Sequence, residues 1–203
     1  MEQKYLKLKI GTPGGEKIVL LHACCAPCST AIVECLLEHD IRPTLFYYNP
    51  NIFPDREYKK RKMECLRHTQ MLGLDFVDAD YDHEKWLGEV KGLEDEPERG
   101  ARCLECFKVR LTATALYANE HGFRVFATTL AASRWKNLEQ ISEAGLYAAA
   151  FFPGLTFWAQ NWRKGGLSER RNELVRLYDF YNQQYCGCEY SMDKRAGLVN
   201  NEK

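Results

Sequence analysis

Three short segments hold seven of the nine cysteines in this 203-residue chain. The first segment contains Cys24, Cys25 and Cys28, the second Cys103 and Cys106, and the third Cys186 and Cys188. Because these segments lie far apart in the sequence, a fold that uses them together must bring three distant parts of the chain to one place. Closely spaced cysteines in a reducing compartment indicate metal binding or redox catalysis.

The N-terminus favours such a compartment. Residues 1–9 lack the apolar core of a secretion signal, and the chain has no run of about 18 apolar residues that would predict a membrane span. We therefore expect a cytoplasmic protein with no membrane contact, whose thiols stay reduced. The odd number of cysteines also argues against a framework of structural disulfides.

Length and composition fit one domain. The hydrophobic share of 45% is enough for a core, and 28 basic residues balance 28 acidic ones. We predict a single α/β domain over residues 1–203, with its core at about 17–192. Because the formal net charge is zero, any contact with a polyanion requires a local basic patch.

Short apolar runs alternate with helical patterns along the chain. Strands are predicted at 17–22, 44–48, 76–80, 124–129 and 156–159. Helices are predicted at 29–39, 55–72, 84–90, 103–120, 137–150 and 168–181, with Asp55 as the cap of the second. This alternation predicts a doubly wound parallel sheet, in which the functional site lies at the carboxyl ends of the strands. Cys24 and Cys25 directly follow the first strand.

The second and third cysteine groups suggest separate roles. Cys103 and Cys106 begin a predicted helix, where free N–H groups and the helix dipole favour thiolates. Thiolates from distant segments suit an iron–sulfur cluster, and four would also hold a structural zinc ion. Either site needs four thiols, so three remain for another role. A disulfide between Cys186 and Cys188 would close a strained, easily reduced ring, and the alternative is that the two thiols bind a second metal.

Four residues outside the set of seven cysteines also need an interpretation. Asp82 follows the third predicted strand, where it is either a metal ligand or acid at the site, or a helix cap. His22 is expected to be a hydrogen-bonded histidine near the end of the sheet. Cys35 and Cys65 stand alone on helical stretches and are expected to be small buried hydrophobes.

Five stretches together carry a family resemblance. They are His22-Ala23-Cys24-Cys25-Ala26-Pro27-Cys28-Ser29, Arg102-Cys103-Leu104-Glu105-Cys106-Phe107, Thr128-Thr129-Leu130, Trp162-Arg163-Lys164 and Tyr185-Cys186-Gly187-Cys188. In their order and spacing they resemble the QueH type of epoxyqueuosine reductase, over about residues 17–192. The first sixteen and the last eleven residues look like extensions.

The resemblance implies an activity and a cofactor. Such an enzyme reduces the epoxide of epoxyqueuosine, at the wobble base of certain tRNAs, to the cyclopentene of queuosine, the last step of queuosine biosynthesis. Its fold is similar to HUP-type, Rossmann-like nucleotide-binding sheets. Its [4Fe–4S] cluster would be held by Cys24, Cys25, Cys103 and Cys106. Electrons would come from a ferredoxin, a flavodoxin or a chemical reductant.

The three remaining thiols have two arrangements under this resemblance. In the first, Cys186 and Cys188 form a redox-active pair. In the second, one cysteine from each of the first and third groups joins Cys103 and Cys106 on the cluster, and the others, with Asp82, hold an additional mononuclear iron. Neither arrangement requires Cys28.

A tRNA substrate requires basic and aromatic contacts. We predict that substrate is bound by Arg134, Trp162, Arg163 and Lys164. Trp135 and Trp162 both neighbour basic residues, as base-stacking platforms often do. The basic run at 59–62 is expected to be a solvated helix face.

Two other classes of protein fit part of the pattern. A thioredoxin-like disulfide oxidoreductase would use Cys25 and Cys28 at the start of a helix, and it would bind no iron. A zinc-stabilised RNA-binding module would hold stoichiometric zinc and have no redox activity. The first alternative leaves the second and third cysteine groups without a role.

Overall fold

A five-stranded parallel sheet forms the centre of the molecule. The structure is a computed structural model that describes residues 8–192. Its strands are β1 (Ile18–His22), β2 (Arg42–Tyr47), β3 (Phe76–Asp78), β4 (Val125–Thr128) and β5 (Thr156–Phe157), in the order β3-β2-β1-β4-β5. β1 occupies the centre because its apolar run is suited to burial on both faces. The predicted parallel α/β sheet is confirmed, while residues 1–7 and 193–203 of the predicted extensions lie outside the described residues.

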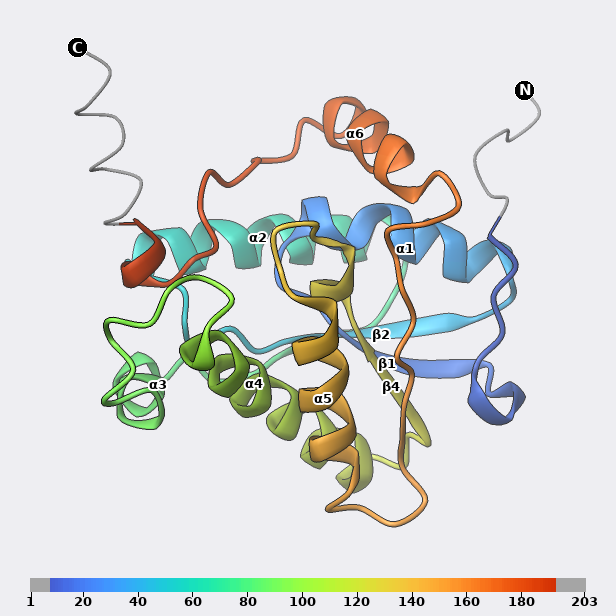
Figure 1. The fold of residues 1–203 in the computed structure, drawn as a ribbon. Coiled ribbons are helices and arrows are strands. Elements are labelled where there is room, and N and C mark those ends of the chain that lie inside the picture. Colours follow the sequence, from blue (N-terminus) through green and yellow to red (C-terminus); the bar gives the residue numbers. More distant parts are fainter. Residues whose placement is uncertain (1–7, 193–203) are drawn as a thin grey trace.

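Helices cover both faces of the sheet (Figure 1). One face carries α1 (Ala26–Glu38) and α2 (Asp55–Met71), with α6 (Leu167–Leu177) packed on α1. The other carries α4 (Ala101–Glu120) and α5 (Leu138–Ala149), and α3 (His83–Glu89) packs against α4. Two 3-10 turns span Pro13–Gly15 (η1) and Thr129–Ala132 (η2). Within residues 8–192, no helix has the length and apolar character needed to cross a membrane.

The observed helix ends differ from the predicted ones for local reasons. The N-cap of α2 is Pro54, and Asp55 is instead the first helical residue, paired with Lys59 four positions on. The prediction of Asp55 as the cap is therefore wrong. α1 begins at Ala26, earlier than predicted, because Pro27 is compatible with the first helical turn. α6 ends at Leu177, and Asp179 then adopts a positive φ of 50° that a helix does not allow.

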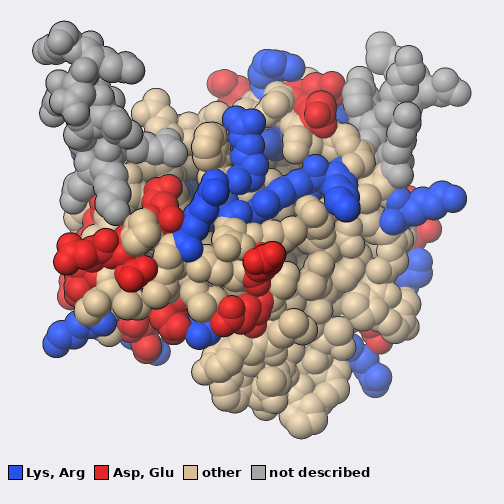
Figure 2. Space-filling model, viewed as in Figure 1, with Lys and Arg blue, Asp and Glu red and all other residues tan. Residues whose placement is uncertain are grey.

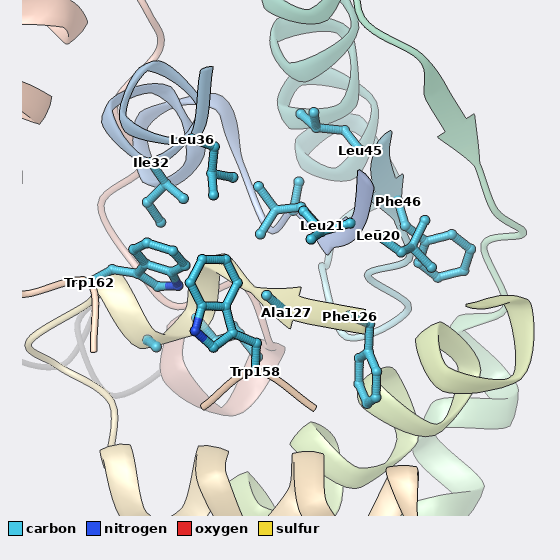
Figure 3. Close-up of a cluster of buried hydrophobic side chains, with 14 of the residues drawn as sticks. Leu20, Leu21, Ile32, Leu36, Leu45, Phe46, Phe126, Ala127, Trp158 and Trp162 are labelled. Carbon is cyan, nitrogen blue, oxygen red and sulfur yellow. The ribbon is translucent and has the colours of Figure 1, made fainter. Parts of the chain in front are cut away.

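The core packs the sheet against its helices (Figure 3). Leu20 and Leu21 of β1 lie between the two helical layers, and Trp158 meets Trp162 edge-to-face with ring centroids 5.2 Å apart. A Cβ atom at Gly145 would lie 2.2 Å from the ring of Phe157, so only glycine lets α5 approach β5 this closely. This dense packing fixes the carboxyl ends of β1 and β4, where the site is built.

Candidate metal and substrate site

The first cysteine group lies at the point where the strand order reverses. β2 and β3 follow on one side of β1, and β4 and β5 lie on its other side. Ligands of doubly wound sheets bind at this crevice between neighbouring carboxyl ends. Cys24 follows β1 and Thr129 follows β4. The backbone N–H of Cys24 donates to the hydroxyl of Thr129 at 3.2 Å, and that hydroxyl lies 3.5 Å from the Sγ of Cys24.

Cys28 joins the two adjacent cysteines to form a triad. The three Sγ atoms of Cys24, Cys25 and Cys28 all lie within 4.8 Å of one another. Cys25 is the N-cap of α1 and Cys28 belongs to its first turn, so the positive end of that helix faces the triad. Cys28, which neither cofactor arrangement requires, therefore belongs to the same thiol group.

The triad combines three different protonation tendencies. Hydrogen bonds from Cys25 and Cys28 hold the pKa of Cys24 well below its usual range, and the charge of Lys136 acts in the same direction. Burial raises the pKa of Cys25, and the hydrogen bond with Cys24 raises the pKa of Cys28 to about 12. The surroundings therefore favour the thiolate form at Cys24 more than at the other two cysteines.

The other two cysteine groups meet the triad across one cavity of about 540 Å³. It is lined by Cys24, Cys28, Cys103, Cys186 and Cys188, one or two from each segment. Cys25 and Cys106 do not belong to the lining: the Sγ of Cys25 lies 3.8 Å from that of Cys24, and Cys106 packs with Cys188 and Trp86 of α3. The prediction that three distant segments converge holds in the structure, where all nine cysteines are free thiols.

Burial favours the protonated form of the two thiols of α4, and the same holds for Cys188. Burial raises the pKa of Cys103 to about 11, although the backbone N–H of Arg99 donates to its Sγ at 3.3 Å. Burial also raises the pKa of Cys106, and it raises that of Cys188 to about 12. A metal ion bound to these sulfur atoms would stabilise their thiolate forms and so favour release of the protons to solvent.

Arg61 anchors the third cysteine segment. Its guanidinium donates to the carbonyl oxygens of Cys186 at 3.1 Å and Tyr185 at 3.3 Å, and it pairs with Glu57 at 2.7 Å. Gly187 fits beside it with a φ of 129°, where a Cβ atom would lie 3.1 Å from the guanidinium. The solvated-face prediction for residues 59–62 is wrong at Arg61, which is 2% exposed. The i,i+4 spacing from Glu57 was the available signal.

The cavity is strongly basic, although the chain is neutral. Its lining includes one acidic residue, Glu98, and eight basic ones: Arg61, Arg99, Arg102, Arg110, Arg134, Lys136, Arg163 and Arg171. Among the described residues, only Arg61 of these eight pairs with a carboxylate. Figure 2 shows basic side chains gathered in the middle of this face. The cavity therefore attracts anionic ligands.

The residues predicted to bind substrate separate into two sets. Arg134 and Arg163 line the cavity. Trp162 also lines it, but its indole is 1% exposed and packed against Trp158 in the core, so it offers little free face to a base. Lys164 is exposed and does not belong to the lining. Trp135, at the rim, is 59% exposed.

Asp82 and His22 both have structural partners. The carboxylate of Asp82 accepts the backbone N–H of Lys85 at 2.9 Å and caps α3, and it does not line the cavity. In His22, Nδ1 hydrogen-bonds the hydroxyl of Thr128 at 2.8 Å and Nε2 hydrogen-bonds the carbonyl oxygen of Tyr48 at 3.1 Å. Burial lowers the pKa of His22 to about 3, as expected for a neutral core histidine.

Cys35 and Cys65 are both completely buried, which confirms their expected role as small hydrophobes. Burial raises the pKa of Cys35 to about 11 and also raises that of Cys65. Neither lines the thiol-rich cavity. These two cysteines therefore serve as internal controls for experiments on the other seven.

Two polar residues of the site were missed from the sequence. The side-chain amide of Gln183 donates to the Sγ of Cys25 at 2.9 Å and lies 3.8 Å from that of Cys28. The ammonium of Lys136 donates to the Sγ of Cys186 at 3.4 Å. Lys136 belongs to a basic run and Gln183 precedes the third cysteine segment, but only the folded chain reveals which sulfur atoms the two side chains contact.

Comparison with known proteins identifies the family. The profile of "Epoxyqueuosine reductase QueH" matches residues 19–194. The QueH epoxyqueuosine reductase of Acinetobacter baylyi is 46% identical over 95% of this chain and 87% of its own length. That of Histophilus somni is 46% identical over 93% of this chain and 77% of its own. The Thermotoga maritima reductase is 34% identical over 87% and 91% of the two chains.

The fold also resembles a solved structure. A predicted subunit of a tRNA methyltransferase from Methanocaldococcus jannaschii has a TM-score of 0.50 and 14% identity, over 76% of this chain and 75% of that one. At this identity the likeness concerns the fold alone, and it agrees with the observed parallel α/β sheet. The 46% sequence identity to these two reductases, with a profile match over most of the chain, shows that the protein belongs to the epoxyqueuosine reductase QueH family of oxidoreductases.

Proposed function

We propose that this protein reduces the epoxide of epoxyqueuosine in tRNA to the cyclopentene of queuosine, the last step of queuosine biosynthesis. The observation that carries the proposal is the convergence of three cysteine segments on one basic cavity. Its volume of about 540 Å³ lies in the range of sites for single small ligands, such as one modified nucleoside. With tRNA as substrate, the cytoplasm is the proposed compartment.

The donor set fits a [4Fe–4S] cluster. We propose Cys24, Cys25, Cys103 and Cys106 as its ligands. Support comes from the triad of closely placed sulfur atoms and from the helix N-termini that begin at Ala26 and Ala101 beside them. When bound to these residues, such a cluster would supply one-electron chemistry.

The remaining thiols suit storage of the reducing equivalents. We propose Cys186 and Cys188 as a redox-active pair: their oxidation to a disulfide releases the two electrons and two protons that reduction of the epoxide consumes, and a ferredoxin or flavodoxin restores the dithiol. The alternative, an additional mononuclear iron held by surplus cysteines and Asp82, is less well supported, because the carboxylate of Asp82 caps α3 away from the cavity lining. A catalytic role of Asp82 stays a prediction.

The reaction consumes two electrons and two protons: both carbon–oxygen bonds of the epoxide break, the carbon–carbon double bond forms, and the oxygen leaves as water. The ammonium of Lys136 lies inside the cavity and carries a proton that its contacts with Cys186, Cys24 and Cys28 help to retain. We propose that Lys136 donates this proton to the departing oxygen. The arginines of the lining orient the anionic substrate and neutralise its charge.

The decisive experiment combines composition with activity. Protein purified without oxygen should contain about four iron and four sulfide per chain, as one [4Fe–4S] cluster requires. It should convert epoxyqueuosine in tRNA to queuosine, as followed by mass spectrometry of nucleosides. C24S and C103S should lose iron and activity, whereas C35S should keep both. Zinc without sulfide would favour the RNA-binding module, and a metal-free, colourless protein would favour the thioredoxin-like enzyme.

A further inference from the structure

Trp135 stands apart from the other tryptophans of the chain. Its indole is 59% exposed on the cavity rim, whereas Trp86, Trp158 and Trp162 are buried. Exposure leaves a large apolar ring in water, and burying such a ring against a flat partner is favourable. The indole is thus available to a ligand that reaches the cavity.

The backbone beneath Trp135 is held by arginines from two other segments. Arg99 donates from Nε to the carbonyl oxygen of Trp135 at 2.9 Å and from Nη2 to that of Arg134 at 3.4 Å. Arg163 donates to the carbonyl oxygen of Lys136 at 2.8 Å. Three successive carbonyl groups are therefore fixed. The backbone that carries the indole ring therefore has a fixed position relative to the cysteines, which reduces the conformational entropy lost when a ligand binds.

The surroundings of the ring indicate what it binds. The guanidinium of Arg134 lies 4.9 Å from the ring centroid, and Arg99, Arg163 and Arg171 line the same cavity without carboxylate partners among the described residues. Proteins that bind single-stranded nucleic acid combine stacked aromatic rings with cations that contact the phosphates. A free phosphate would use the cations alone and would leave the ring in water.

We propose that Trp135 stacks on a nucleobase next to the modified nucleotide, so that the turn at 133–136 recognises an RNA strand and not a single nucleoside. This inference deepens the proposed function and rests on it. Trp135 is a binding residue here, with no part in the chemistry of the epoxide.

Affinity measurements test the proposal. Trp135→Ala should weaken binding of an anticodon stem–loop containing epoxyqueuosine about five- to 150-fold, the equivalent of one stacked base. Trp135→Phe should keep most of the affinity, and binding of the free nucleoside should be equal in all three proteins. The matched control is Tyr147→Ala, which removes another exposed aromatic ring, on α5 and outside the cavity. An unchanged stem–loop affinity in Trp135→Ala would overturn the proposal.

Tryptophan fluorescence gives a second readout that is independent of turnover. Because Trp135 is the exposed tryptophan of the four, the stem–loop should protect wild-type emission from acrylamide, and this protection should be absent in Trp135→Phe. If the wild-type protein reduces the epoxide in the stem–loop but its emission is not protected, the stacking of Trp135 is refuted and the proposed function is not. Protection by a stem–loop whose epoxide is never reduced would refute the proposed function and leave the stacking in place.

Discussion

The Nζ of Lys136 lies 3.4 Å from the Sγ of Cys186, and the same ammonium group interacts with Cys24 and Cys28 from the first cysteine segment. Burial alone would lower the pKa of Lys136, but its interaction with these three cysteines raises the pKa above the usual value. Lys136 is therefore charged at neutral pH, and it joins two cysteine segments that are more than 150 positions apart.

Removing this charge should slow the reaction. We expect Lys136→Met to lower turnover about ten- to a hundredfold, because a hydrogen bond from a charged donor contributes about 1.5–3 kcal/mol. Lys136→Arg should keep more activity, and Lys17→Met, which changes an exposed lysine outside the lining, should keep all of it. Single-turnover kinetics measure the effect. Equal rates in the Lys136→Met and Lys17→Met proteins would show that the charge is dispensable.

Replacing Cys188 separates the two proposed uses of the third cysteine group. Cys188→Ser should reduce turnover at least about tenfold. If Cys186 and Cys188 form a redox pair, the ratio of iron to sulfide should stay at one. If they hold an additional iron, the variant should lose iron but no sulfide. Cys35→Ser, at a fully buried cysteine away from the cavity, is the control. Undiminished turnover in Cys188→Ser would exclude both uses.

The basic lining should make tRNA binding sensitive to salt. Each phosphate neutralised by the protein contributes about −0.7 to −0.9 to the slope of log affinity against log salt concentration. Arg134→Gln should weaken binding and make the slope shallower by about one such contribution. Lys17→Gln, which changes an exposed lysine outside the lining, should leave the slope unchanged. Filter binding over a range of salt concentrations provides the measurement, and a flat dependence in the wild-type protein would contradict a phosphate-binding cavity.

His68 should make the fold sensitive to acid. This residue of α2 is buried, and its Nε2 atom lies 3.2 Å from the hydroxyl of Thr30 on α1. Burial lowers the pKa of His68 from about 6.5 to about 4. Since the unfolded chain binds this proton more tightly, the contribution to stability is complete above about pH 6.5. It is lost progressively as the pH falls toward 4, by an amount on the order of 3 kcal/mol.

Urea unfolding followed by circular dichroism tests this pH dependence. The free energy of unfolding should fall between about pH 7 and pH 5 in the wild-type protein. It should fall less in His68→Gln. A smaller acid effect should remain in that variant, because burial also lowers the pKa of His22, to about 3. Identical pH profiles of the two proteins would show that His68 is not the group responsible.

Local sequence patterns were sufficient for most of the fold. The buried run of β1 and the amphipathic pattern of α4 each predicted their element, because a parallel sheet needs apolar strands and helices with one apolar face. Element ends were less predictable, as Asp55 shows, because capping depends on how the chain enters the helix.

The sequence by itself determined the chemistry available to this protein: three cysteine segments in an otherwise neutral chain, with the first placed directly after the central strand. Only the tertiary structure decided which side chains share the cavity. It placed Cys28 in the triad, buried Arg61 behind Cys186 and left Trp135 exposed on the rim. Spacing along a chain limits which residues can meet within one element, whereas contacts between loops depend on how the whole core packs.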